Sequence, residues 1–192
     1  EIVLQLVAKY LVLSSDPKQE NNSLVLCNNA AWATNMLLLT YPTEIAQHLD
    51  TLAKQFVELL LTKKLNDTFA YNLAANIGLI ALYQPKAISP YLSQITKNWA
   101  IAMDNPYTNK EKLTTFKGFF LAINENPDGV ATDFPYLCTT LLRYQGIDQE
   151  LELAWKNLFI YFKKIMAENW DSYLMIFPQK VLSDINMRFG SQ

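Results

Sequence analysis

The sequence predicts an all-α solenoid, in which antiparallel helical hairpins stack side by side to form a right-handed superhelical arch. The main observation is an apolar stripe that occurs twice, 43 residues apart. Its spacings are four, three, four and four residues, and the two copies are Ile45, Leu49, Leu52, Phe56, Leu60 and Ile88, Leu92, Ile95, Trp99, Met103. The same shift carries Pro42 onto Pro85 and Asn29 onto Asn72. A period in the low forties with two helices per unit is typical of HEAT repeats.

The composition supports the same fold class. Hydrophobic residues make up 51% of the 192 residues and charged residues 18%, which is enough apolar material for a continuous core. Only 5 residues are glycine, and no long stretch alternates between apolar and polar residues as a half-buried strand would. Long helices are therefore expected throughout.

The first hairpin is expected at about residues 1–40 and the second at about 43–84. In the first, apolar residues recur on one helical face over 2–14, and an Ala- and Leu-rich helix follows over 24–40. In the second, a helix over 44–62 follows the Tyr41-Pro42-Thr43 turn, and the next helix runs from Asn66 or Asp67, as its N-cap, to about Tyr83.

The third hairpin is expected at about 87–126 and the fourth at about 129–167. Helices are predicted over 87–104, from a capping box at 108–111 to about residue 125, over 130–144, and from Asp148 to about 167. Pro135 lies in the first turns of the helix over 130–144 and is expected to bend it or to delay its start.

Residues 168–192 are expected to form a C-terminal cap, because the aromatic residues Trp170, Tyr173, Phe177 and Phe189 suit a unit that closes the last repeat. Residues 1–192 are thus predicted to be a single HEAT-repeat array. The chain starts at Glu1 and directly with helix-like sequence, so we expect it to be a fragment of a longer array.

Several function classes have no support in the sequence. Its formal net charge of -2 and the lack of long basic runs argue against nucleic-acid binding, and polar residues interrupt the apolar stretch 24–39, so no membrane span is expected. Cys27 and Cys138 match no metal or redox spacing and are expected to be buried free thiols. No phosphate-binding or catalytic motif occurs, and His48 is the single histidine. We therefore expect a monomeric binding protein without enzymatic activity, metal or cofactor.

Several separate strings resemble one family, in the same order and spacing. The first is Cys27-Asn28-Asn29-Ala30-Ala31-Trp32-Ala33, and the others are Asn72-Leu73-Ala74-Ala75-Asn76-Ile77-Gly78, Phe116-Lys117-Gly118, Asn126-Pro127-Asp128-Gly129-Val130, Glu168-Asn169-Trp170 and Phe177-Pro178. Together they resemble the C-terminal HEAT repeats of transportin, the karyopherin-β2 group of importin-β-family nuclear import receptors. The resemblance covers about residue 24 to the end, whereas residues 1–23 carry little of it.

This resemblance implies a function in nuclear import. In that family the second helix of each hairpin lines the concave face of the superhelix. The cargo is an extended, disordered nuclear localisation signal with a hydrophobic or basic N-terminal element and a C-terminal Pro-Tyr. Further partners, Ran in its GTP form and FG nucleoporins, would act through the full-length receptor, whose Ran-binding repeats are not in this chain. The receptor would shuttle between cytoplasm and nucleus through the nuclear pore.

Four residues are the candidate cargo-binding site. Trp32 matches the family tryptophan that contacts cargo on the concave face, and tryptophan is a frequent interface anchor. The 43-residue shift carries Trp32 onto Ala75, where the family has a larger aliphatic residue, so the apolar patch is expected to be smaller here. Asn29 and Asn72 are equivalent and could hydrogen-bond a peptide backbone.

Each of these assignments has an alternative. Trp32 could instead pack between repeats, and Asn29 and Asn72 could form a structural ladder that ties neighbouring repeats together. At the level of function, the alternative is a HEAT-repeat scaffold that bridges proteins and has no role in transport.

Overall fold

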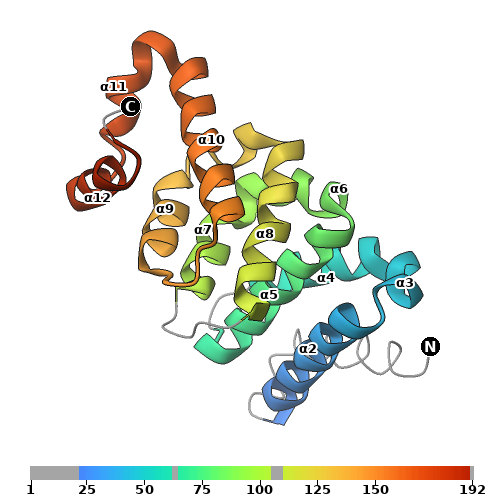
Figure 1. Ribbon diagram of the computed structural model, residues 1–192. Helices are drawn as coiled ribbons and strands as arrows, with labels where there is room; N and C mark the ends of the chain where they lie inside the picture. The colour runs from blue at the N-terminus through green and yellow to red at the C-terminus, as the bar shows by residue number, and fades with distance from the viewer. Residues whose placement is uncertain (1–21, 62–64, 105–109, 191–192) are drawn as a thin grey trace.

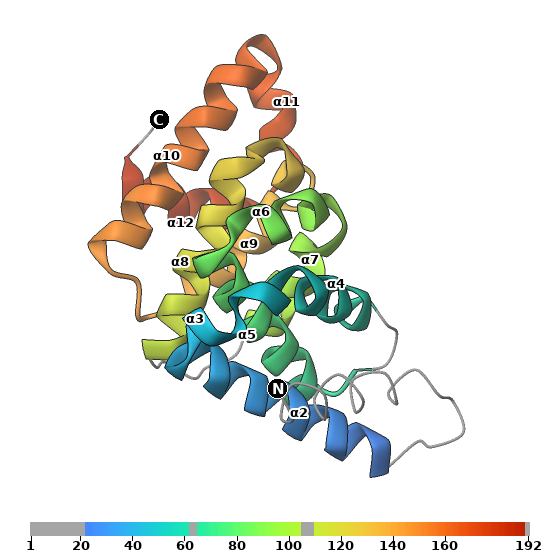
Figure 2. The same cartoon turned by 90° about the vertical axis from the view of Figure 1, so that its right-hand side faces the viewer.

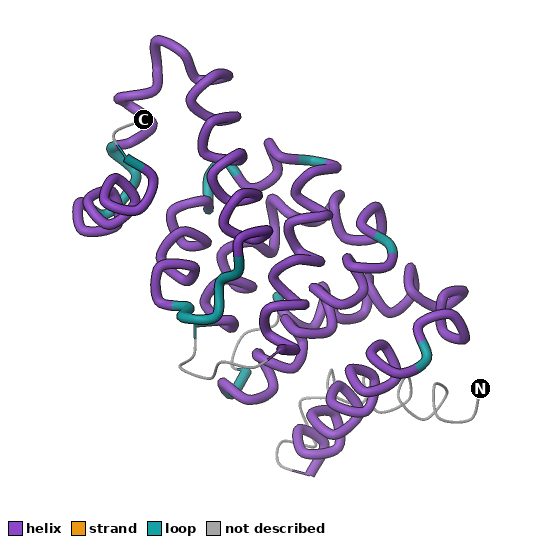
Figure 3. The backbone as a smooth tube through the Cα atoms, in the orientation of Figure 1, coloured by secondary structure: helices purple, strands orange, loops and turns teal. Residues whose placement is uncertain are grey.

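The computed structural model describes residues 22–61, 65–104 and 110–190, and every regular element in these ranges is a helix (Figure 3). The helix predicted over 2–14 lies outside the described residues. The described part begins with the second helix of the predicted first hairpin, α2 (Asn22–Thr40). The all-α prediction is confirmed for this part of the chain.

The longer helices form two layers (Figures 1 and 2). In the layer made by the second helices of the hairpins, the order of neighbours is α2, α5 (Asp67–Tyr83), α8 (Lys110–Glu125) and α10 (Gln149–Met166). In the other layer the order is α4 (Leu49–Leu60), α7 (Leu92–Met103), α9 (Phe134–Arg143) and α12 (Gln179–Phe189). This alternation confirms a HEAT-type stack, whereas the right-handed sense of the superhelix stays a prediction.

The first helix of each middle hairpin is broken, which corrects the continuous helices predicted over 44–62 and 87–104. Before α4 the chain forms α3 (Pro42–Ile45) and a 3₁₀ turn over Ala46–His48. Before α7 it forms α6 (Pro85–Ile88) and a 3₁₀ turn over Ser89–Tyr91. Pro90 explains the second break, because proline has no N–H and its ring clashes with the carbonyl four residues earlier. The first break occurs at the equivalent position without a proline.

Local signals set the start of several helices. The Asn66 side chain accepts a hydrogen bond of 2.9 Å from the Phe69 N–H, and Asp148 accepts one of 3.0 Å from the Leu151 N–H. Both predicted N-caps are thus confirmed. The helix predicted from residue 130 starts later, at Phe134, with Pro135 in its first turn, because a 3₁₀ turn occupies Pro127–Val130. The capping box at 108–111 lies partly outside the described residues.

Buried aromatic residues join the two layers. Trp99 on α7 stacks on Phe119 of α8 with 3.8 Å between ring centroids, and its indole Nε1 donates a 2.9 Å hydrogen bond to the Ala74 carbonyl of α5. Trp155 on α10 donates to the Sγ of Cys138 at 3.3 Å, and burial raises the pKa of this thiol. Both cysteines are buried thiols that form no disulfide, as the sequence predicted.

Two glycines let α5 and α8 approach each other closely. A Cβ atom on Gly118 would lie 1.9 Å from the Gly78 carbonyl oxygen, and a Cβ atom on Gly78 would lie 2.5 Å from Thr115. Real Cβ atoms do not approach other atoms so closely. The spacing of these two helices therefore depends on glycine at both positions.

The C-terminal cap folds back over α10 and α9. After α10, a 3₁₀ turn over Ala167–Asn169 leads into α11 (Trp170–Leu174). Trp170 packs edge-on against Phe159, with 5.2 Å between ring centroids, and the Tyr173 hydroxyl donates a 2.7 Å hydrogen bond to the Ala131 carbonyl. These contacts reverse the chain at Ala167, which has a φ of 43° and a ψ of -111°.

Replacing Ala167 with glycine is expected to raise the free energy of unfolding by about 1 kcal/mol, because positive φ strains alanine and not glycine. Chemical denaturation of the two proteins measures this difference. Ala46→Gly is the matched control, because Ala46 has helical angles of φ -50° and ψ -40°, where glycine should lower stability by up to about 1 kcal/mol. A loss of stability in both variants would show that the backbone at Ala167 is not strained.

Candidate functional site: the exposed face of α2

Helix α2 is apolar on almost all sides. One side packs into the core through Cys27, Ala30, Ala31 and Leu38. On another side, residues spaced four, three and seven apart share a helical face and remain exposed: Val25, Asn29, Trp32 and Leu39. We call these four residues the α2 stripe. Its large apolar members have 60%, 56% and 39% of their surface exposed for Val25, Trp32 and Leu39.

Trp32 is the largest side chain of the α2 stripe. No described residue stacks on its indole ring or accepts a hydrogen bond from its N–H, whereas Trp99 and Trp155 are fully buried and both donate. Asn29 lies one turn before Trp32 and is also exposed, so its amide faces solvent beside the indole. The stripe thus offers an apolar contact surface next to a solvent-exposed amide.

Asn72 lies in a different environment from Asn29. It is 92% buried within α5, and its Nδ2 donates a 2.8 Å hydrogen bond to the Oδ1 of Asn28. Asn76, one turn further along α5, donates to the Ala31 carbonyl at 2.8 Å and to the Asn72 carbonyl at 2.7 Å. These bonds form an amide ladder between α2 and α5, in which the partner of Asn72 is Asn28 and not Asn29.

Ala75 has no exposed surface. Its helix, α5, is flanked by α2 and α8, and a direct bond joins these two neighbours: the Asn35 Nδ2 donates to the Glu111 Oε1 at 2.5 Å. Asn35 is itself fully buried. Of the four candidate residues, Trp32 and Asn29 therefore lie together on the surface, whereas Asn72 and Ala75 lie beneath it.

Two members of the α2 stripe were not among the site residues predicted from the sequence. Val25 and Leu39 extend the exposed face by one turn or more on each side of Asn29 and Trp32, and their helical spacing could have revealed them. Asn28 and Asn35 bind other helices, and nothing in the sequence distinguishes them from Asn29. Among the described residues no cluster of His, Cys, Asp or Glu could hold a metal ion, and no helix there has the length and apolarity of a membrane span.

The comparisons with known proteins agree on one group. The chain is 26% identical over 166 residues to "Transportin" of Dictyostelium discoideum and 27% identical over 154 residues to "Transportin-1" of Homo sapiens. The chain is similar to transportins. These matches cover 86% and 80% of the chain. "Importin subunit beta-2" of Schizosaccharomyces pombe is 27% identical over 124 residues, which is 65% of the chain.

The similarity to transportins covers only part of each relative. The chain spans less than a fifth of the length of these relatives, at 18%, 17% and 14% in the same order. No protein-family model matches it.

Proposed function

We propose that this chain is part of the cargo-binding surface of a transportin-like nuclear import receptor, and that the α2 stripe binds an extended nuclear localisation signal of the Pro-Tyr type. The observation that carries the proposal is the exposed Trp32, with 56% of its surface accessible on the same helix as the exposed Val25 and Leu39. Exposed apolar patches of this kind mark interaction sites. The similarity to transportins supplies the class of partner.

The chemistry of the α2 stripe suits an extended peptide. Trp32 offers a large apolar contact area at a small cost in side-chain entropy, as interface anchors do. The Asn29 amide can donate to and accept from a peptide backbone, which gives affinity without requiring one sequence. No bond is made or broken in this function, so the proposed role is binding and not catalysis.

The remaining parts of the import cycle would lie outside this chain. We place the chain at the C-terminal part of the receptor, where it would meet the N-terminal element of the signal. Ran in its GTP form and FG nucleoporins would act through the full-length receptor as it shuttles between cytoplasm and nucleus. A disordered signal must be ordered when it binds, and linking several weak elements raises their effective concentration. The isolated chain is therefore expected to bind a signal peptide weakly.

Replacing Trp32 with alanine is expected to weaken binding of a signal peptide by about 2 kcal/mol, which is roughly thirty-fold in Kd. The probe is a fluorescein-labelled synthetic peptide with a hydrophobic N-terminal element and a C-terminal Pro-Tyr, titrated with the chain and followed by fluorescence polarisation. The free energy of unfolding should change little, because more than half of the Trp32 side chain is already in water.

The matched control is Ile101→Ala. Ile101 is also 56% exposed, but it lies on α7 in the other layer, so this change should leave the peptide affinity unaltered. Unchanged affinity in Trp32→Ala together with a marked loss of stability would mean that the indole packs between repeats. Wild-type protein that does not bind the peptide at any attainable concentration would favour a scaffold without a transport role.

A further inference from the structure

The turn between α8 and α9 contains a chemically reactive pair of residues. Asp128 and Gly129 lie in the 3₁₀ turn Pro127–Val130, and no other Asp-Gly or Asn-Gly pair occurs in the sequence. Asp-Gly is the dipeptide in which aspartate isomerises most readily, because glycine has no side chain to shield its backbone nitrogen from the preceding carboxyl group. Asp128 is exposed, so water reaches this carboxyl group. The turn therefore combines a reactive pair with access to water.

Tight packing requires the glycine of this pair. A Cβ atom on Gly129 would lie 2.9 Å from the Cβ of Leu92 on α7 and 2.8 Å from the Nδ2 of Asn126. Asn126 is held in place, because its Nδ2 donates a 2.9 Å hydrogen bond to the Ser89 carbonyl. The fold thus keeps a glycine directly after Asp128, and it keeps the reactive pair as a consequence.

Two backbone hydrogen bonds hold the peptide unit between Asp128 and Gly129. Its N–H, from Gly129, donates to the Asn126 carbonyl at 3.1 Å, and its carbonyl, from Asp128, accepts from the Ala131 N–H at 3.1 Å. Isomerisation begins when the Gly129 nitrogen attacks the Asp128 Cγ and closes a five-membered ring. In this planar ring the nitrogen lies in line with the Asp128 Cβ, so ψ of Asp128 must leave the 3₁₀ value of about −25°. Both hydrogen bonds must break for this rotation.

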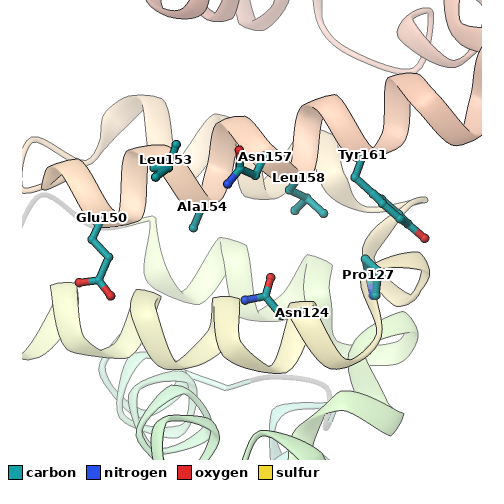
Figure 4. A pocket seen from close by; sticks show the side chains of 8 residues that line it. All are labelled: Asn124, Pro127, Glu150, Leu153, Ala154, Asn157, Leu158 and Tyr161. Atoms are coloured by element: carbon teal, nitrogen blue, oxygen red, sulfur yellow. The ribbon is translucent and has the colours of Figure 1, made fainter.

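A further hydrogen bond holds the side chain of Asp128. The Tyr161 hydroxyl of α10 donates to the Asp128 Oδ1 at 2.9 Å. In Figure 4 the Tyr161 side chain is directed toward the turn that begins at Pro127. This hydrogen bond, and then burial, raise the pKa of Tyr161, so the hydroxyl keeps its proton and remains a donor at neutral pH. An Oδ1 atom tied to α10 restrains the rotation that would bring the carboxyl group to the Gly129 nitrogen.

The Tyr161 bond lies at the edge of a cavity between α8 and α10. This cavity has a volume of about 440 Å³, and both Tyr161 and Pro127 line it (Figure 4). The bond from α10 to the turn thus crosses open space and not a layer of packed side chains. A movement of α10 away from α8 would therefore release the Asp128 carboxyl group.

We propose that Asp128 is a site of spontaneous isomerisation to isoaspartate, and that Tyr161 protects it for as long as α10 packs against the turn. After release, the Gly129 nitrogen attacks the Asp128 Cγ, and the nitrogen's proton and a carboxyl hydroxyl leave as water. A water molecule then opens the ring. Attack at the main-chain carbonyl gives isoaspartate, in which the main chain runs through Cγ and is one CH₂ longer, so the 3₁₀ turn and the Tyr161 bond are lost. This inference goes beyond the proposed function, because the reaction involves no cargo.

The test incubates the folded 192-residue chain at physiological temperature and neutral pH and follows isoaspartate over time. Protein L-isoaspartate methyltransferase with radiolabelled S-adenosylmethionine counts the isoaspartate, and mass spectrometry of the tryptic peptide locates it. Tyr161→Phe keeps the aromatic ring and should raise the rate at Asp128 about five-fold, as expected from the loss of one hydrogen bond. Unfolding in guanidinium chloride should raise the rate further, because it also frees the two backbone hydrogen bonds.

Tyr136→Phe is the matched control, because Tyr136 is an exposed tyrosine on α9 whose ring contacts the Lys97 ammonium and not Asp128, so the rate should stay that of the wild type. Asp128→Glu should remove most of the isoaspartate, since the longer side chain cannot close a five-membered ring. The proposal is overturned if the folded and the unfolded wild type react at the same rate, if Tyr161→Phe and Tyr136→Phe behave alike, or if Asp128→Glu leaves the isoaspartate count unchanged.

Discussion

Gly118→Ala is expected to lower the free energy of unfolding by about 3 kcal/mol, at the upper end of what overpacking usually costs. The added Cβ would lie 1.9 Å from the Gly78 carbonyl oxygen and 2.8 Å from the Leu82 backbone nitrogen. Both are backbone atoms of α5, so no side chain can rotate to make room and the two helices must move apart. Alanine has the higher helix propensity, so the loss comes entirely from this contact.

Urea denaturation followed by circular dichroism measures this loss. Asn124→Ala is the control on the same helix, because Asn124 is exposed and its replacement should change stability by at most about 0.5 kcal/mol. A denaturation midpoint for Gly118→Ala equal to that of the wild type would mean that α5 and α8 do not approach each other as closely as described. Gly118→Ala should also disturb the bond between Asn35 of α2 and Glu111 of α8, because this bond depends on the positions of the two helices that flank α5.

Trp99→Ala is expected to lower the free energy of unfolding by about 3–5 kcal/mol, the usual range for removing a buried tryptophan. Trp99 is fully buried, stacks on Phe119, and meets Phe116 edge-on with 5.3 Å between centroids. Its removal leaves a cavity between the two layers and leaves the Ala74 carbonyl without its indole donor. The same denaturation experiment measures the effect.

Two comparisons make the Trp99 prediction specific. Trp99→Phe keeps an aromatic ring and should lose less than Trp99→Ala, because the remaining cavity is smaller. Trp32→Ala, by contrast, should hardly change stability but should weaken peptide binding. Equal losses of stability in Trp99→Ala and Trp32→Ala would contradict the separation of a structural tryptophan from a binding one.

The parts of the fold that depend on local chemistry could be predicted from the sequence. The N-caps at Asn66 and Asp148 and the late start of the helix at Phe134 each depend on a residue and its neighbours within one turn. The repeated stripe also identified Trp99 as a core residue, because a 43-residue period with helical spacing fixes which side of each helix faces its partner. The breaks at Ala46–His48 and Ser89–Tyr91 were both missed, although Pro90 marks the second; no proline or glycine marks the first.

The sequence predicted only part of the candidate site. A shift of 43 residues pairs Trp32 with Ala75 and Asn29 with Asn72, because these positions have the same helical phase. Burial, however, separates the two pairs: Trp32 and Asn29 are exposed, and Asn72 and Ala75 are not. The side of a helix on which a residue lies follows from the sequence of that helix alone. Whether that side is buried depends on how closely the neighbouring helices approach.

The sequence by itself thus determined the stacked helical hairpins, the core-facing stripe and the tryptophan that the transportin resemblance singles out. Only the tertiary structure decided which inner surfaces are open. Gly78 and Gly118 bring α5 and α8 into backbone contact, whereas α10 is joined to its neighbours by side chains: Lys117 of α8 contacts Asp148 at the start of α10, and Tyr161 of α10 bonds Asp128 in the 3₁₀ turn after α8. These distances arise from pairs of residues about 33 to 40 positions apart in the chain, and a pattern within one helix carries no information about them.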